Sequence, residues 1–188
     1  MEASRSFAQR WTYAEFARLP DDGNRYEVID GELQATPAPR PAHQALVGEL
    51  TTRLTAFVRD HDLGWIVPGP VDVLFAEGDY LEPDLVFVRR ERLQVVTERG
   101  IEGAPDLVVE VASPSTARAD RGIKRERYAR FGVPEYWVVD ADTRSVEVYR
   151  MLVDPTHPEV VRDVLTWSPV PGGPALRIDV QDALKGFS

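Results

Sequence analysis

The sequence contains no cysteine, and this absence excludes two kinds of site. Without thiols the chain can form neither a disulfide framework nor a thiolate zinc site. A chain of 188 residues can fold without such links, because a domain of this size buries roughly 70% of the surface that its unfolded form exposes. We therefore expect a fold that rests on its apolar core and tolerates a reducing compartment.

Long apolar runs are also absent. Nowhere do the roughly eighteen consecutive apolar residues of a membrane-spanning helix occur. Residues 1–10 mix charged and polar side chains with few apolar ones, which is not typical of a signal peptide. These absences predict a cytoplasmic protein without a membrane partner.

Basic residues are outnumbered, with 22 Lys plus Arg against 31 Asp plus Glu and a net charge of −9. The summed field repels a polyanion unless basic residues gather locally or bound cations neutralise carboxylates, so avid non-specific DNA binding is not expected. Lysine is especially scarce, because only Lys124 and Lys185 are lysines and every other basic residue is arginine.

Several familiar catalytic motifs are missing. The sequence has no phosphate-binding P-loop, no dinucleotide glycine fingerprint and no G-x-S-x-G nucleophile elbow. Ser113 and Ser115 precede an expected helix, where capping of the helix start explains both.

The apolar patterns predict a single α/β domain over residues 1–188, with a core at about 12–150 and a weakly assigned tail at 151–188. Strands 71–75 and 81–88 are expected to form an antiparallel pair. The expected elements are a helix capped by Thr12 and ending near Leu19, a hairpin around Asp30-Gly31, a helix from about Ala42 to His61, strands at 65–67, 71–75, 81–88 and 107–112, a helix at about 117–131, and strands at 135–139 and 146–151.

A carboxylate interrupts an otherwise apolar strand at Glu110, where an unpaired charge would be strongly penalised. Such a group requires a cation. Asp84, directly after Pro83, lies on the strand expected just before it and shares a strand face with Val86 and Val88. Two carboxylates on neighbouring strands are the hard oxygen ligands that Mg²⁺ prefers, so Asp84 and Glu110 predict a magnesium site.

The third member of this expected site is Lys124. It forms one helical stripe with Tyr128 and Phe131, and the two aromatic rings indicate that the stripe faces the sheet. Two other interpretations stay open at this stage. Glu110 could form a structural ion pair with Arg121 or Arg125, and Lys124 could extend along the surface into solvent.

The motifs together resemble a known family, the Uma-two family of putative restriction endonucleases, within the PD-(D/E)XK nuclease superfamily. The resemblance covers about residues 12–149. The residues that carry it are Tyr26-Glu27-Val28-Ile29-Asp30-Gly31-Glu32-Leu33, Pro83-Asp84-Leu85, Ala104-Pro105-Asp106-Leu107-Val108-Val109-Glu110-Val111, Ser113-Pro114-Ser115-Thr116, Lys124, Tyr128 and Glu135-Tyr136-Trp137-Val138-Val139-Asp140.

The resemblance implies a restriction-endonuclease-like α/β fold, a central mixed sheet flanked by helices, and hydrolysis of DNA phosphodiester bonds with Mg²⁺ or Mn²⁺. It implies that Asp84 and Glu110 bind the metal, that the Val111 carbonyl adds a ligand, and that Glu27 helps at a second position. Two positions after Glu110, where the superfamily usually has a lysine, this chain has Ala112. The resemblance therefore implies that the catalytic lysine is Lys124, on the helix that follows. A homodimer is expected because both DNA strands would be cut.

Other functions and residues remain candidates. The domain could be a catalytically silent module that binds nucleic acid or protein, or a hydrolase of small phosphodiesters that uses the same acidic site. His43 is an outside candidate for the site. Asp106 lies roughly 13 Å along its strand from Glu110 at ~3.3 Å per residue, which excludes a shared ion and favours a strand-entry role.

Overall fold

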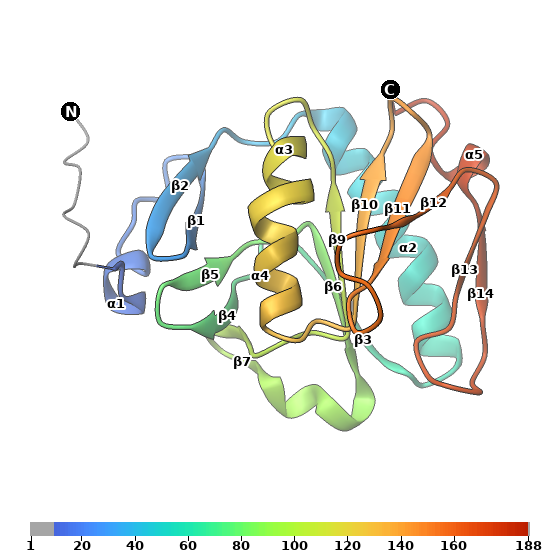
Figure 1. Cartoon of the computed structure of the whole chain (residues 1–188), viewed down its shortest axis with the longest axis horizontal. Coiled ribbons are helices and arrows are strands. Elements are labelled where there is room, and N and C mark those ends of the chain that lie inside the picture. The colour runs from blue at the N-terminus through green and yellow to red at the C-terminus, as the bar shows by residue number, and fades with distance from the viewer. Residues whose placement is uncertain (1–9, 188) are drawn as a thin grey trace.

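The structure is a computed structural model that describes residues 10–187 (Figure 1). Residues 1–9, where we expected no signal peptide, lie outside the described residues. The helices are α1 (Tyr13–Phe16), α2 (Pro41–Asp60), η1 (Arg90–Val95), α3 (Ala117–Ala119), η2 (Asp120–Lys124), α4 (Arg125–Arg130) and α5 (Val180–Ala183). The strands are β1 (Arg25–Ile29), β2 (Glu32–Thr36), β3 (Gly64–Pro68), β4 (Val73–Ala76), β5 (Asp79–Leu81), β6 (Leu85–Arg89), β7 (Val96–Thr97), β8 (Gly100–Glu102), β9 (Leu107–Val111), β10 (Glu135–Asp140), β11 (Ser145–Arg150), β12 (Glu159–Val161), β13 (Val164–Trp167) and β14 (Leu176–Asp179).

The central sheet has the strand order β12-β11-β10-β9-β6-β3. Strands β9 and β10 run parallel, and the other neighbours in this sheet are antiparallel, so the expected mixed sheet is confirmed. Every residue of β9 is buried, as its nearly unbroken apolar sequence predicted. A strand buried on both faces positions its side chains firmly, and this strand carries Glu110.

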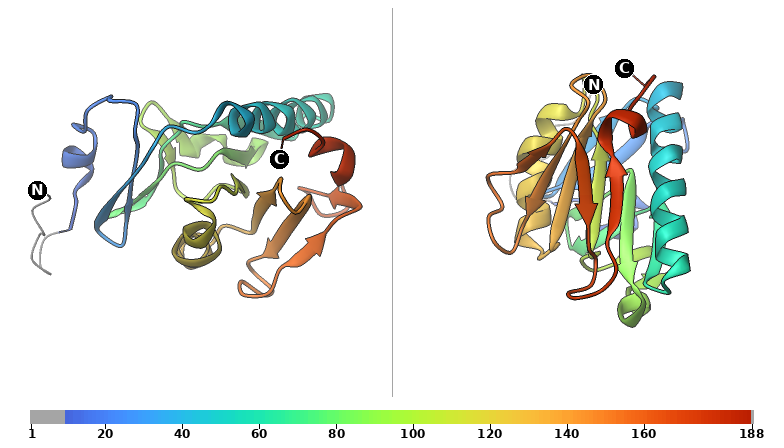
Figure 2. Two further views of the ribbon diagram at one scale, coloured as in Figure 1. Left: turned by 90° about the horizontal axis from the view of Figure 1, so that it is seen from above. Right: turned by 90° about the vertical axis from the view of Figure 1, so that its right-hand side faces the viewer.

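Helices cover both faces of the central sheet (Figure 2). On one face α2 packs its apolar stripe, including Leu50 and Leu54, against odd-numbered residues of β6 and β9 such as Phe87 and Val109. The continuous helical stretch α3–η2–α4 lies over the other face, where Tyr128 joins the even-numbered valines of β6 and β9 in one cluster.

A second sheet, with the order β2-β1-β5-β4-β8-β7, stands beside the first (Figure 1). Its β1–β2 hairpin turns at Asp30-Gly31, where both residues have positive φ (55° and 84°), as the sequence predicted. The single strand expected at 81–88 is wrong. It is divided into β5 and β6, because the chain crosses from the second sheet to the central one at Glu82–Asp84, where Pro83 has no N–H for a sheet hydrogen bond.

The expected antiparallel pairing of 71–75 with 81–88 is therefore only half correct. Strand β4 pairs antiparallel with β5, whereas β6 pairs with β3 and β9. This division has a functional consequence, because Asp84 lies at the crossing point, where residues of both sheets come together.

The helix expected at 117–131 contains a π-helical turn that the sequence pattern did not reveal. The turn spans Asp120–Lys124, and its Gly122 departs from helical geometry (φ −110°, ψ −106°). The extra residue of a π turn rotates the helix that follows, and such turns often occur at functional sites. Here both ends of the turn, Asp120 and Lys124, are buried.

Two shorter predictions need correction. Helix α1 begins after the Thr12 cap, with the predicted capping box to Glu15, but ends at Phe16 rather than Leu19. The tail at 151–188 contributes more than expected. Strand β12 extends the central sheet, and the β13–β14 hairpin with α5 places Trp167 and Leu184 in the main core at 1% exposure each.

No helix in residues 10–187 combines the length and the apolar character needed to cross a membrane.

Candidate metal-dependent active site

Asp84 and Glu110 lie side by side, on adjacent antiparallel strands. In the register, Leu85 pairs with Val109, so the next position places Asp84 opposite Glu110. Opposed residues of an antiparallel pair point to the same face of the sheet. Both carboxylates are buried, at 5% and 3% exposure. Glu110 contacts Lys124, whereas Asp84 contacts Arg25 of β1 and His43 of α2.

Lys124 reaches into the space between the two sheets and contacts three carboxylates. Its Nζ is 2.6 Å from Glu110 Oε1, 3.0 Å from Glu27 Oε1 and 3.8 Å from Asp120 Oδ1. The lysine is only 4% exposed, so the interpretation in which it extends into solvent is wrong. The structure thus brings together the three residues that the sequence singled out first, and Glu27 with them.

Two further hydrogen bonds hold the acidic side chains in place. The Tyr128 hydroxyl donates to Glu110 Oε1 at 2.8 Å, and the Glu82 backbone N–H donates to Glu27 Oε1 at 2.9 Å. On Glu110 the tyrosine and the lysine use the same oxygen, so neither contact requires Oε2. This arrangement fixes the carboxylate while one oxygen stays outside both contacts.

Asp84 has different partners from Glu110. Its Oδ1 accepts a hydrogen bond from the Arg25 guanidinium at 2.8 Å, and its Oδ2 accepts one from the Val111 N–H at 2.8 Å. The Nε2 atom of His43 lies 3.2 Å from the same Oδ2. Burial alone would raise the pKa of Asp84, but the hydrogen bond to His43 and the charge of Arg25 outweigh it and lower this pKa to about 2.

Glu110 and Lys124 are in direct contact in the protein interior, and further carboxylates lie around them. Burial raises the pKa of Glu110 to about 8; Lys124 lowers it, and the Asp120 and Asp84 carboxylates raise it further. For Lys124, burial lowers the pKa, but Glu110, Glu27 and Asp120 outweigh that effect and raise it. The ammonium is therefore charged, and the surrounding carboxylates still favour another cation.

Asp120 is a member of this site that the sequence analysis missed. It is 1% exposed, and neither carboxylate oxygen makes a hydrogen bond of ordinary geometry with the described residues. Burial raises its pKa, while Lys124 lowers it. The spacing of four between Asp120 and Lys124 was the available signal, because residues four apart share a helix face.

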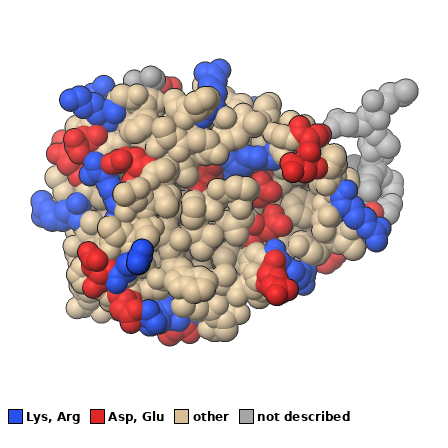
Figure 3. Space-filling view, turned by 180° about the vertical axis from the view of Figure 1, so that it is seen from behind, with Lys and Arg blue, Asp and Glu red and all other residues tan. Residues whose placement is uncertain are grey.

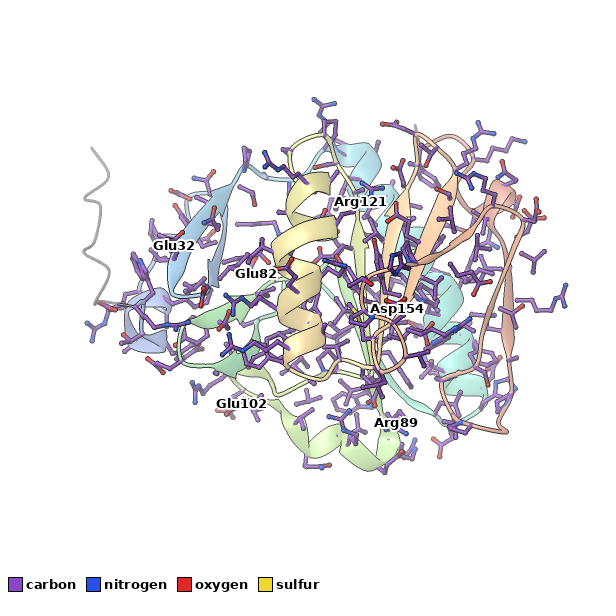
Figure 4. All side chains as sticks on the ribbon, in the orientation of Figure 1. Glu32, Glu82, Arg89, Glu102, Arg121 and Asp154 are labelled. Carbon is purple, nitrogen blue, oxygen red and sulfur yellow. The ribbon has the colours of Figure 1, made fainter. Side chains whose placement is uncertain are left out.

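Arg25 and Glu82, also missed, border the site where it meets solvent. Arg25 lies 3.5 Å from Glu82 Oε2 and also donates to the Glu82 carbonyl, beside a hollow of about 110 Å³ that is lined by Arg25, Pro39, Gln44, Gly69, Pro70 and Asp84. Glu82 lies between the β1–β2 hairpin and the helix that carries Lys124 (Figure 4). Burial raises the pKa of Glu82 to about 7, although Arg25 lowers it.

The structure shows the partners of the other residues that the sequence raised as candidates. Arg121 pairs with Asp140 and Glu147, and Arg125 donates to carbonyls at 155 and 156, so neither is the partner of Glu110. Asp106 is bound by Arg89 and Arg92 at the entry of β9, as expected of a strand-entry residue. His43 does belong to the site, through its contacts with Asp84 and the Val111 carbonyl.

The donors present match the chemistry of a hard divalent cation, since they are carboxylate and main-chain carbonyl oxygens. In residues 10–187, however, no group of three or more His, Asp or Glu side chains is arranged so that it could hold a metal ion. Arg25 and Lys124 lie among the carboxylates instead. Binding of a metal would therefore require at least one of these cations to shift.

Comparison with known proteins agrees with the observed fold. The family model Uma2, described as "Putative restriction endonuclease", matches residues 13–181. The fold is similar to that of a protein from Anabaena variabilis ATCC 29413 described as a putative nuclease belonging to DUF820, with a TM-score of 0.78 and 20% identity over 95% of this chain and 99% of that chain. No curated protein matches the chain.

Proposed function

Because the chain belongs to the Uma2 family of putative restriction endonucleases, we propose that it is a metal-dependent endonuclease that hydrolyses DNA phosphodiester bonds. The observation that carries the proposal is the contact of the buried Lys124 with Glu110 and Glu27, together with the position of Asp84 opposite Glu110 in the strand register. A buried cluster with more carboxylates than cations is costly unless it binds a further cation, and this cost favours a functional role.

Asp84, Glu110 and the Val111 carbonyl would hold Mg²⁺ or Mn²⁺, with Glu27 at a second or bridging position. When bound, the ion would supply Lewis-acid stabilisation of the phosphate and an acidified water. The Val111 N–H and Tyr128 hydroxyl orient Asp84 and Glu110 from behind, so the two carboxylates keep their direction when a cation arrives.

Lys124 is the proposed catalytic lysine. Ala112 occupies the place where the PD-(D/E)XK pattern usually has its lysine, and the Lys124 ammonium instead reaches Glu110 from the helix, at 2.6 Å. Its three N–H donors could orient the attacking water and stabilise charge on the reacting phosphate. Asp120 supports this role, because it lies four residues before Lys124 on the same helix face and both side chains are buried.

The substrate must approach a protein with a net charge of −9. On the face that α2 covers, Figure 3 shows acidic and basic side chains interspersed around a broad neutral centre, without a continuous basic area among the residues drawn in colour. Arg25, at the edge of the hollow beside Asp84, is positioned to meet a phosphate. A homodimer, which would bring two such sites to one duplex, remains part of this proposal.

The direct test is cleavage of plasmid DNA by the purified chain with Mg²⁺ or Mn²⁺. Lys124→Met and Asp84→Asn should each lose activity, whereas Lys185→Met, which replaces the other lysine at an exposed position, should keep it. Circular dichroism would show that each variant is folded. Absence of cleavage across DNA substrates, or full activity in folded Lys124→Met, would overturn the proposal.

A second candidate function is a nuclease-like module that binds nucleic acid or protein without cutting. The observation that favours it is the mutual neutralisation of the site, with Arg25 on Asp84 and Lys124 on Glu110 and Glu27. This candidate predicts retained DNA or protein binding without turnover. Calorimetric binding of Mn²⁺ that Asp84→Asn removes, together with cleavage, would exclude it.

A further inference from the structure

We infer that His43 is a ligand of the metal ion, binding through Nε2 beside Asp84 and the Val111 carbonyl. This inference rests on the proposed metal-dependent function and deepens it, because a nitrogen ligand changes which divalent ions the site prefers. From the sequence alone His43 is only an outside candidate, since one histidine at the start of a helix is ordinarily a satisfied polar residue.

The spacing of the donor atoms is the main observation. His43 Nε2 lies 3.2 Å from Asp84 Oδ2 and 3.1 Å from the Val111 carbonyl oxygen. One carboxylate oxygen and one main-chain carbonyl oxygen thus lie within hydrogen-bonding distance of one imidazole nitrogen. All three are atom types that would hold a divalent ion such as Mn²⁺.

The position of the ring is firmly set. His43 lies in the first turn of α2, which begins at Pro41 and follows a proline-rich lead-in. The ring is largely buried, with 13% of its side chain exposed, and within residues 10–187 its polar contacts are made by Nε2. The other nitrogen, Nδ1, is buried and has no hydrogen-bonding partner among residues 10–187.

The unpartnered Nδ1 allows the change of tautomer that ligation requires. To bind the ion through Nε2, a neutral ring must carry its one hydrogen on Nδ1 instead of Nε2, whereas a protonated ring keeps the Nδ1 hydrogen and releases the Nε2 proton to solvent. No hydrogen bond at Nδ1 is broken by this change, because the protein makes none there. With the ion present, His43 Nε2, Asp84 Oδ2 and the Val111 carbonyl oxygen would each bind it, and these bonds would replace the two contacts at Nε2.

A nitrogen ligand favours Mn²⁺ and Co²⁺ over Mg²⁺ more than an all-oxygen site does. The first experiment therefore uses Mn²⁺ as both ligand and probe. Electron spin-echo modulation of bound Mn²⁺ should show a coupled ¹⁴N nucleus, and the signal should change to that of ¹⁵N when the protein is grown with ¹⁵N-histidine. This measurement requires no substitution and therefore carries no risk of misfolding.

Variants then assign the nitrogen to one of the three histidines. His43→Asn should lose the nitrogen signal and lower the ratio of Co²⁺ to Mg²⁺ affinity, measured by calorimetry, about tenfold. His157→Asn, at an exposed position, should change neither.

The outcomes separate this inference from the proposed function. Mn²⁺ that binds in wild type and is lost in Asp84→Asn, but shows no histidine nitrogen, would overturn the role of His43 and leave the nuclease site intact. A nitrogen signal that persists in folded His43→Asn would do the same. If no Mn²⁺ binds at all, the proposed metal site fails, and the inference fails with it.

Discussion

Two Pro-Asp pairs precede neighbouring strands of the central sheet, and both aspartates are buried and bound by arginine. Asp106, after Pro105, accepts hydrogen bonds from Arg89 and Arg92. Asp84, after Pro83, accepts one from Arg25. Because β6 and β9 run antiparallel, the two aspartates lie at opposite ends of this strand pair.

Their surroundings differ in the balance of charge. Around Asp106 two guanidiniums satisfy one carboxylate, and Arg92 also donates to a main-chain carbonyl. Around Asp84 the carboxylates of Glu110, Glu27 and Asp120 gather about one lysine. Ion pairing alone therefore does not distinguish a functional aspartate from a structural one. An excess of buried carboxylates favours uptake of a proton or of a further cation, and this makes Asp84 rather than Asp106 the candidate for function.

The largest expected difference between the two aspartates is in catalysis. Asp84→Asn should lower DNA cleavage by a factor on the order of 10² or more, because it removes a ligand and a charge that the reacting phosphate needs. Asp106→Asn should leave the rate within about twofold when the folded fraction is taken into account. Plasmid cleavage at saturating Mn²⁺ measures both. Equal losses in the two variants would refute the distinction.

The next difference concerns stabilisation by metal. Mn²⁺ at one hundred times its dissociation constant should raise the free energy of unfolding of the wild type by about 2.7 kcal/mol, because only the folded state binds the ion. Asp106→Asn should keep this increment, and Asp84→Asn should lose most of it. Urea unfolding with and without Mn²⁺ supplies the values. An increment that survives in Asp84→Asn would place the ion elsewhere.

In the metal-free protein, a substitution at Asp106 should cost more stability than a substitution in the site around Asp84. Asp106→Asn should cost about 2 kcal/mol of stability, because Arg89 and Arg92 lose a charged acceptor. Glu110→Gln should cost less than about 1 kcal/mol, since glutamine can still accept from Tyr128 and relieves the surplus of negative charge. Urea unfolding in the presence of a chelator compares the two. A larger loss for Glu110→Gln would contradict the electrostatic account.

Sequence reasoning identified the core of the site because its signals were local. A glutamate within an apolar strand, an aspartate after proline and a lysine on an aromatic helix stripe are each visible within a few residues. Burial and strand pairing then bring them together, and the confirmed mixed sheet follows from the same periodicity.

The residues that sequence reasoning missed depend on long-range geometry. Arg25 reaches Asp84 from the second sheet, and this contact exists only because the chain crosses between sheets at Glu82–Asp84. Asp120 enters the site from the helix that carries Lys124, and apolar spacing does not reveal that an acidic side chain there is buried. The tail was underestimated for a related reason, because Trp167 and Leu184 lie on short elements whose burial comes from tertiary packing.

The smallest expected effect is the change of metal-free stability over a single pH unit. The pKa of Glu110 is about 8 in the folded protein and near 4.3 when unfolded, so between these values the folded state retains a proton that the unfolded state has lost. Stability should therefore fall as pH rises through this window, by at most ~1.4 kcal/mol per pH unit from this group. Glu82, with its pKa of about 7, adds to the same slope.

Substitution separates the contributions to this slope. Glu110→Gln should reduce the fall in stability and leave the parts due to Glu82 and to His43, whose pKa burial lowers but the hydrogen bond and charge of Asp84 raise overall. Asp106→Asn should lower stability by a similar amount at each pH and so keep the wild-type slope. Asp84 does not interfere, because its folded pKa of about 2 makes its contribution complete above pH ~4 and lost only in stronger acid. Urea unfolding at several pH values between about 5 and 8, with a chelator present, measures the slope. An unchanged slope in Glu110→Gln would mean that Lys124 keeps Glu110 ionised throughout, and that the surplus negative charge near Asp84 is carried by the other carboxylates.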